Sequence, residues 1–229
     1  SANPTLAQAP PTANEPPQEF KDWESLVRPY TLLSQARLYS LYSRARQVCE
    51  QDLAGDFVEC GACRGGSSAL LAAVLKKYTQ RPRKLYSFDT FEGMPDPTEV
   101  DRHAGILAND TNFGAGTLKA PLQENLEKIC REMDVLDVVE PVAGLFADTF
   151  PIYSPQIESI ALLHADADWY ESTMDIFNTF YDVVVPSGYV QVDDYGFWEG
   201  CKKAVHDFEQ SRGTKFKFHL HQIDFTGVW

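Results

Sequence analysis

The 229-residue chain lacks the features typical of membrane-spanning and nucleic-acid-binding proteins. No apolar run approaches the roughly 20 residues that a membrane-spanning helix needs, and no secretory signal is recognisable. Acidic residues outnumber basic ones by 33 to 20, which gives a formal charge of -13. Because no basic stripe is available to meet phosphates, we expect binding neither to nucleic acids nor to an anionic membrane surface.

Cysteine is also scarce, and its pattern is not that of a disulfide framework. The five residues are odd in number and scattered through predicted helices and strands, so we expect reduced thiols in a cytoplasmic protein. Cys60 and Cys63 form a C-x-x-C pair, which leaves a thiol–disulfide activity open as an alternative. Against that alternative, Cys60 ends a predicted strand and the pair continues directly into a glycine-rich turn. The cysteines are Cys49, Cys60, Cys63, Cys130 and Cys201.

The apolar content of 44% suits one globular domain, and its pattern alternates between strand-like and helix-like segments. This alternation predicts an α/β fold with a mostly parallel sheet and an edge or antiparallel last strand. The predicted strands occupy residues 56–60, 84–89, 138–142, the runs that start at 159 and 188, and 215–221. The predicted helices lie at 23–51, 67–78, within 117–133, at 172–181 and at 199–212.

Two segments fall outside this pattern. Residues 1–20 are rich in Pro, Ala, Asn and Gln, and we expect a disordered leader ahead of a single domain at 21–229. Residues 95–120 form a long polar stretch inside that domain, which is typical of a lid over a binding site. His103 lies in this lid, where it is a candidate substrate contact or base.

A strand, a glycine-rich turn and a helix start follow one another in DFVECGACRGGSS, residues 56–68. Glycines let a backbone approach a ligand closely, and a helix start offers free N–H groups, so the segment suits a nucleotide-type cofactor. Asp89 ends the next predicted strand, at a spacing that allows it to bind ribose hydroxyls. Taken singly, the turn could be an ordinary turn and Asp89 a helix N-cap.

Four aspartates follow two further strand-like runs. Asp166 and Asp168 end the first run, and Asp193 and Asp194 end the second. Strands that end at one edge of a sheet would bring these carboxylates together, and crowded like charges favour a bound cation or a shared proton. Carboxylate ligands suit Mg²⁺, Mn²⁺ or Ca²⁺, and one of the acids could act as a general base. Helix capping and solvated charges remain the alternative.

Several of these motifs together resemble the macrocin O-methyltransferase family. Its members are metal-dependent enzymes that use S-adenosylmethionine to methylate sugar hydroxyls of macrolide and aminocoumarin antibiotics. The resemblance runs from about Tyr30 to the end of the chain, and DADWYEST with the later VDDY is its most specific part. The matching stretches are 56–68, 86–95 (YSFDTFEGMP), 166–173 (DADWYEST), 188–195 (GYVQVDDY), 200–208 (GCKKAVHDF) and 221–228 (HQIDFTGV).

The resemblance implies a class I, Rossmann-like methyltransferase sheet with helices on both faces and a reversed last strand. It implies Asp168 as general base, and an N-terminal helix near Tyr30 and Arg37 that covers the cofactor. The implied Mg²⁺ ligands are Asp166, Asp193 and Asp194. The implied S-adenosylmethionine contacts are Thr31, Ser34, Glu59, Gly61, Ser67, Asp89, Thr90, Phe91 and Asp166.

The acceptor implied by the resemblance is a small molecule with a sugar or diol hydroxyl, in natural-product biosynthesis; a catechol is also compatible. Two residues depart from the family pattern: Cys63 replaces an aromatic residue, and His164 stands where a basic or apolar residue is usual. We expect His164 to be a hydrogen-bonded core residue. A non-catalytic protein that binds an adenosine cofactor is the second alternative, and a homo-oligomer is left open.

Overall fold

The structure is a computed structural model that describes residues 15–229. Most of the predicted leader lies outside the described residues. Helix α1 begins at Gln18, so the predicted boundary at residue 20 is too late. None of the helices in the described part of the chain is long and apolar enough to cross a membrane.

Five parallel strands form the central sheet in the order β5-β2-β1-β6-β7. The chain reverses its direction of travel across the sheet after β5, so β1 and β6 are neighbours at the switch point. Ligands bind beyond the carboxyl ends of such strands. The strands are β1 (Asp56–Cys60), β2 (Leu85–Asp89), β5 (Val139–Ala143), β6 (Ile160–Ala165) and β7 (Val184–Val192).

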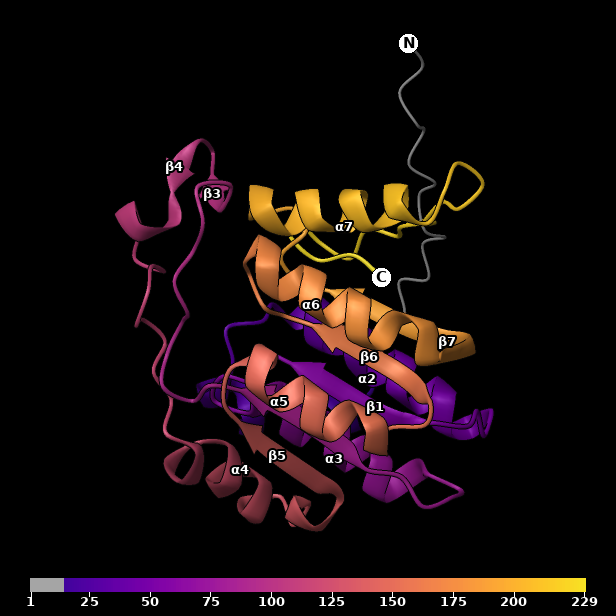
Figure 1. The fold of residues 1–229 in the computed structure, drawn as a ribbon. Helices are drawn as coiled ribbons and strands as arrows, with labels where there is room; N and C mark the ends of the chain where they lie inside the picture. Colours follow the sequence, from indigo (N-terminus) through magenta and orange to yellow (C-terminus); the bar gives the residue numbers. More distant parts are fainter. Residues whose placement is uncertain (1–14) are drawn as a thin grey trace.

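Helices cover both faces of the sheet, as predicted (Figure 1). Side chains alternate between the faces along each strand, and Phe57 of β1 therefore packs with one helical layer while Val58 packs with the other. The first layer consists of α1 (Gln18–Val27), α2 (Gln35–Glu50), α3 (Gly66–Tyr78) and α4 (Leu126–Glu132). The second consists of α5 (Phe146–Tyr153), α6 (Tyr170–Phe180) and α7 (Glu199–Ser211).

The predicted long helix at 23–51 is in fact two helices with a break between them. A short 3-10 turn at Arg28–Tyr30 contains Pro29, which has no N–H group to continue the helical hydrogen bonds, and the chain is extended at Thr31. Ser34 then starts α2, because its hydroxyl accepts a hydrogen bond from the backbone N–H of Arg37 at 3.1 Å. The break matters for the site, because it brings Thr31 to the carboxyl edge of the sheet.

The predicted late strand at 215–221 is wrong, since the structure assigns no strand to this segment and its backbone pairs at the last residue alone, where His221 exchanges hydrogen bonds with Trp229. Its aromatic side chains pack against α6 and the turn that follows it instead. The ring centroid of Phe218 lies 5.8 Å from that of Phe177 in α6 and 5.5 Å from that of Tyr181. The reversed strand is reduced to an antiparallel bridge, in which Val228 exchanges backbone hydrogen bonds with Val192 at 2.8 and 2.9 Å.

The predicted lid forms an ordered excursion along the carboxyl edge of the sheet. It runs from the α7 side of the molecule down to α4 (Figure 1). Two short antiparallel strands, β3 (Arg102–His103) and β4 (Ile106–Leu107), form its tip, and a 3-10 turn at Ala108–Asp110 follows.

Candidate active site

A cavity of about 650 Å³ opens at the carboxyl edge of the sheet. Its walls come from the segment before α2, the glycine turn after β1, the lid, and the loops after β2, β6 and β7. This volume is typical of a site for a small molecule. The predicted site residues that line it are Thr31, Gly61, Ser67, Asp89, Thr90, Asp166, Asp168 and Asp194.

The glycine turn after β1 lies directly against the acidic turn after β6. Gly61 has φ +98°, and a Cβ atom built there would lie 1.6 Å from the carbonyl oxygen of Asp166. The backbone N–H of Asp166 donates to the carbonyl of Cys60 at 2.8 Å, which holds the two turns together. Only glycine allows the predicted cofactor turn and the predicted metal turn to approach so closely.

Asp89 ends β2 at the cavity wall and caps no helix. Its carboxylate accepts hydrogen bonds from the backbone N–H groups of Cys63 (2.8 Å) and Phe91 (2.7 Å), which fix its orientation. Burial raises the pKa of this carboxyl, although the two N–H groups oppose that shift. Oδ1 also accepts a hydrogen bond from the Thr90 hydroxyl at 3.5 Å, whereas Oδ2 keeps a further lone pair and can still accept a hydrogen bond from a ribose hydroxyl.

Four predicted site residues do not line the cavity. Glu59 and Asp193 are fully buried, and Phe91 is 3% exposed within the core. Ser34 caps α2, and its hydroxyl also donates to Asp224 Oδ2 at 2.5 Å. Their predicted contacts with the cofactor or the metal stay predictions.

A buried chain of charged groups joins the ends of three strands beneath the cavity. The His164 imidazole bonds through Nδ1 to Glu59 Oε1 at 2.9 Å and through Nε2 to Asp193 Oδ1 at 3.0 Å. Burial lowers the pKa of His164, but the two carboxylates outweigh this and raise it to about 9. His164 is therefore a cation at neutral pH, and the prediction of a hydrogen-bonded core residue is confirmed.

Arg37 of α2 connects this buried chain of charged groups to the C-terminal turn that contains Asp224. Its NH1 group donates to Asp193 Oδ2 at 2.7 Å, and its Nε group donates to Asp224 Oδ2 at 3.1 Å. Ser34 donates to the same oxygen of Asp224. The C-terminal turn therefore holds the segment before α2, whose Thr31 lines the cavity.

We expect the stability of the protein in acid to depend on Asp224. Burial raises the pKa of this carboxyl, but hydrogen bonds from the Gly227 N–H and the Ser34 hydroxyl, together with Arg37, outweigh it and lower the pKa to about 2 from 3.8. A carboxyl with a depressed pKa contributes stability that is full above its unfolded-state pKa and is lost as the pH falls through its folded-state pKa. The contribution of Asp224 should therefore fade between pH 3.8 and about 2.

Urea unfolding of the wild type and of Asp224→Asn across this pH range measures that contribution. The difference in unfolding free energy should be constant above the unfolded-state pKa and shrink towards the folded-state value, because all other carboxyls titrate alike in both proteins. A difference that stays constant down to the lowest pH would contradict the depressed pKa of Asp224.

The pKa values of the four aspartates are shifted in different directions. Burial, followed by the charges of neighbouring aspartates, raises the pKa of Asp166 and of Asp168 well above the usual range and that of Asp194 to about 6. Burial acts in the same direction on Asp193, but His164 and Arg37 outweigh it and lower its pKa. Asp193 thus stays ionised, whereas the other three need a proton or a cation to relieve their repulsion.

The donor set fits a hard divalent cation. Among the described residues, His164, Asp166 and Asp193 each offer a ligand atom within 4.8 Å of the others. Both nitrogens of His164 already bond to carboxylates, however, so the imidazole has no lone pair left for a metal. Carboxylate oxygens suit Mg²⁺, and a cation would relieve the raised pKa values of Asp166 and Asp194.

Asp168 lies beside these residues in an unusual conformation. Its backbone is left-handed, with φ +58°, and its N–H donates to Asp194 Oδ2 at 3.3 Å. Its carboxylate oxygen Oδ1 accepts a hydrogen bond from the Trp198 indole Nε1 at 2.8 Å. The side chain lines the cavity and is partly exposed to it.

The first part of the lid is fixed next to Asp168. The Trp169 indole donates to the carbonyl of Pro95 at 3.0 Å, and the backbone N–H of Tyr170 donates to Asp101 Oδ1 at 2.7 Å. Asp101 is fully buried, and it meets an N–H group at the start of α6. The lid is therefore anchored on the segment that carries Asp168.

His103, a predicted substrate contact, does not line the cavity. Its Nδ1 atom bonds to the carbonyl oxygen of Phe197 at 2.8 Å, and the two rings are stacked with centroids 3.9 Å apart. The structure thus places His103 in the attachment of the lid tip to the loop before α7.

Comparison with known protein families shows to which family the chain belongs. The profile of the macrocin-O-methyltransferase (TylF) family matches residues 3–229. The chain belongs to the macrocin O-methyltransferase family. It is therefore an enzyme, an O-methyltransferase, and the predicted resemblance is confirmed.

Two relatives are similar to this chain over most of its length. The 8-demethyl-8-(2,3-dimethoxy-alpha-L-rhamnosyl)-tetracenomycin-C 4'-O-methyltransferase of Streptomyces olivaceus is 32% identical over 209 residues, which are 91% of this chain and 77% of that protein. The demethyldecarbamoylnovobiocin O-methyltransferase of Streptomyces niveus is 33% identical over 214 residues, 92% of this chain and 78% of that protein.

Solved structures agree on the fold. The O-methyltransferase NovP superimposes with a TM-score of 0.75 at 32% identity, covering 87% of this chain and 80% of NovP. The calicheamicin methyltransferase CalS11 gives a TM-score of 0.69 at 21% identity, covering 94% and 93%. The predicted class I methyltransferase fold is thereby confirmed, with its reversed strand reduced to the bridge at Val228.

Membership of the macrocin O-methyltransferase family removes the non-catalytic alternative, and the thiols give no support to the redox one. Cys60 is fully buried, and burial raises its pKa well above that of a free thiol. Burial also raises the pKa of Cys63 to about 11. Thiol–disulfide exchange needs a thiolate, and these two thiols stay protonated at neutral pH.

Sequence reasoning did not assign roles to Trp198, Asp101 or Asp224. Each acts through a partner at least 30 positions away: Asp168, Tyr170 and Ser34, respectively. The one available signal was the position of Trp198, four residues after Asp194 on the loop that leads into α7.

Proposed function

We propose that this enzyme transfers a methyl group from S-adenosylmethionine to a hydroxyl of a sugar or other diol-bearing small molecule, with Mg²⁺ as a cofactor. Asp166, Asp193 and Asp194 would hold the metal, and Asp168 would act as the general base. The observation that supports the proposal is the contact between the glycine turn and the acidic turn, beside a cavity that Gly61, Asp166 and Asp194 line.

The acceptor class rests on the relatives. The Streptomyces olivaceus protein is named for the 4' position of a rhamnosyl group, and a relative from Micromonospora griseorubida, 29% identical over 204 residues, is a mycinamicin III 3''-O-methyltransferase. These names favour a sugar-bearing natural product as the acceptor here. The cavity has room for such a group, because the lid and the loops after β6 and β7 line it beyond the glycine turn.

When bound, S-adenosylmethionine supplies an electrophilic methyl group, and Mg²⁺ supplies a charge that lowers the pKa of the acceptor hydroxyl. Asp89 would orient the ribose, and the glycine turn would bring backbone N–H groups to the methionine end. Thr31 would cover the cofactor from the segment that Arg37 and Asp224 hold in place.

Asp168 is suited to take up the proton of the acceptor hydroxyl. It lines the cavity beside Asp194, and its proton affinity is raised by burial and by the neighbouring acids. Asp193, which Arg37 and His164 keep ionised, would anchor the metal side of the site without moving. Positioning of the acceptor oxygen against the methyl group then provides much of the rate.

Calorimetric titration of S-adenosylhomocysteine and, separately, of Mg²⁺ into metal-free protein tests the proposal. We expect the wild type to bind both, and Asp194→Asn to bind S-adenosylhomocysteine but to lose Mg²⁺ uptake. Asp194 is a cleaner target than Asp193, because Asp193 also neutralises Arg37 and His164. Asp182→Asn is the matched control, since Asp182 forms an exposed ion pair with Arg212 and does not line the cavity.

Two outcomes would overturn parts of the proposal. Failure of the wild type to bind S-adenosylhomocysteine would mean that the glycine turn does not form this cofactor site. Unchanged Mg²⁺ uptake by Asp194→Asn, or full turnover in the presence of a chelator, would remove the metal. A panel of vicinal-diol sugars, rhamnosides and catechols then identifies the acceptor class by turnover.

A further inference from the structure

The proposed general base, Asp168, lies on a turn whose own packing does not fix the orientation of its carboxylate. Asp168 has φ +58°, in the left-handed region that residues other than glycine seldom adopt. The preceding Ala167 and the acid itself are partly exposed to the cavity, so packing alone does not fix the carboxylate. A group that must meet a hydroxyl within hydrogen-bonding distance needs an external contact to hold it.

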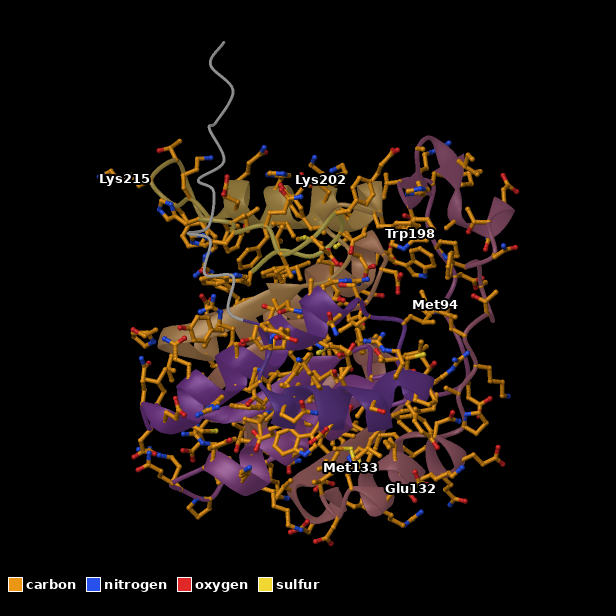
Figure 2. The ribbon with its side chains drawn as sticks, turned by 180° about the vertical axis from the view of Figure 1, so that it is seen from behind. Met94, Glu132, Met133, Trp198, Lys202 and Lys215 are labelled. Atoms are coloured by element: carbon orange, nitrogen blue, oxygen red, sulfur yellow. The ribbon has the colours of Figure 1, made fainter. Side chains whose placement is uncertain are left out.

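Trp198 supplies that contact. Its side chain is 2% exposed, and its indole Nε1 donates to Asp168 Oδ1 at 2.8 Å. The indole itself is held by packing: Trp169 meets it edge-on with centroids 4.8 Å apart, and Phe197 does so at 5.1 Å. Figure 2 shows Trp198 below the start of α7, on the side of the molecule that the lid crosses, near Met94.

The hydrogen bond uses one carboxylate oxygen and leaves the other available. Among the described residues, the Trp198 indole is the one side-chain donor to the carboxylate of Asp168, and no hydrogen bond reaches Oδ2. A planar carboxylate with one oxygen fixed has its second oxygen fixed in space as well. The bond therefore orients the oxygen that remains free to receive a proton.

We propose that Trp198 is the positioning residue of the reaction, and that its indole N–H holds Asp168 Oδ1 so that Oδ2 faces the acceptor hydroxyl. The inference rests on the proposed role of Asp168 as the base. Trp198 acts through Asp168, so its loss should lower kcat and leave the affinities for cofactor and metal unchanged. Misplacement of a reacting group by about 1 Å costs roughly 10²-fold, so we expect a loss of kcat of about 10- to 100-fold.

Replacement of Trp198 by 3-benzothienylalanine, which has sulfur in place of the N–H group and nearly the same shape, tests the bond without emptying the core. The same replacement at Trp23 of α1 is the matched control, because Trp23 packs against Tyr42 and does not line the cavity. Trp198→Phe is a second variant made by ordinary mutagenesis. Each protein is assayed for kcat, acceptor KM, S-adenosylhomocysteine affinity and melting temperature.

The expected result is a 10- to 100-fold fall in kcat for both Trp198 variants, with acceptor KM within about threefold and a melting temperature close to that of the wild type for the benzothienyl protein. In the Asp168→Asn background the Trp198 change should cost little more, because the two residues act as one unit. A kcat within twofold of the wild type in the benzothienyl protein would overturn the inference. A rise in KM at constant kcat would also overturn it, because Trp198 would then bind the acceptor directly.

Failure of the inference differs from failure of the proposed function. If Asp168→Asn keeps near-normal turnover, the base assignment itself is wrong, and the role of Trp198 falls with it. If Asp168→Asn is impaired while the benzothienyl protein is fully active, the base stands and only the positioning role of Trp198 is lost.

Discussion

Replacing Asp168 with asparagine should lower turnover by about 10²- to 10⁴-fold, which is the usual contribution of a general base. Asparagine keeps the size of the side chain and an oxygen that can accept the Trp198 hydrogen bond, so the left-handed turn should persist. What it removes is the ability to take up a proton from the acceptor hydroxyl. Steady-state kinetics with saturating cofactor and metal measures the effect.

The control separates catalysis from folding and binding. Asp168→Asn should melt within a few degrees of the wild type and bind S-adenosylhomocysteine with similar affinity, and Asp182→Asn on the surface should keep full turnover. Near-normal turnover by a folded, metal-loaded Asp168→Asn protein would exclude Asp168 as the base.

The second large effect is on stability. His164→Leu should lower the free energy of unfolding by about 3–5 kcal/mol, because it removes the cation from a buried ion pair and leaves a carboxylate uncompensated. Asp193 would still have Arg37, so the cost arises chiefly at Glu59, whose remaining hydrogen bond comes from the Ser68 hydroxyl. Urea unfolding at neutral pH, followed by circular dichroism, measures the change.

The double variant Glu59→Gln with His164→Leu is the matched test of this cause. Glutamine has no charge to leave uncompensated and can still bond to Ser68, so the double variant should recover a good part of the lost stability. If the double variant is less stable than His164→Leu alone, the loss stems from packing rather than from the buried charge of Glu59.

The local features of the fold were predictable from the sequence. The runs at β1, β2, β5 and β6 located four strands to within a residue or two. The signal is strongest at β2 and β6, because buried parallel strands are continuously apolar. The fifth, β7, begins at Val184 rather than at Gly188, because its first half is an edge with exposed residues and lacks that signal. The segment predicted as a strand at 215–221 alternates correctly but forms no strand, and its backbone pairing is confined to His221 with Trp229 in the described part of the chain, since alternation reports side-chain burial and not hydrogen bonding.

In the candidate site, too, the features encoded by local sequence were predictable and the contacts between distant residues were not. The glycine turn and the acids were visible in the sequence because each follows a strand, and the sheet brings strand ends together. The partners that hold them were not visible. Arg37 with Asp193, Trp198 with Asp168, and Asp224 with Ser34 are separated by 156, 30 and 190 positions, and no local pattern encodes which distant side chain will meet which.

The contact between Gly61 and the Asp166 carbonyl has a consequence for attempts to redesign the acceptor range. Because the two turns share a backbone contact with no room for a methyl group, neither can be exchanged for that of another enzyme without the other. The lid is joined through Pro95 and Asp101 to Trp169 and Tyr170, directly after the acidic turn, and through His103 to the loop before α7. A chimera should therefore exchange the segment 104–116 and keep these three joining residues together with the pair of turns.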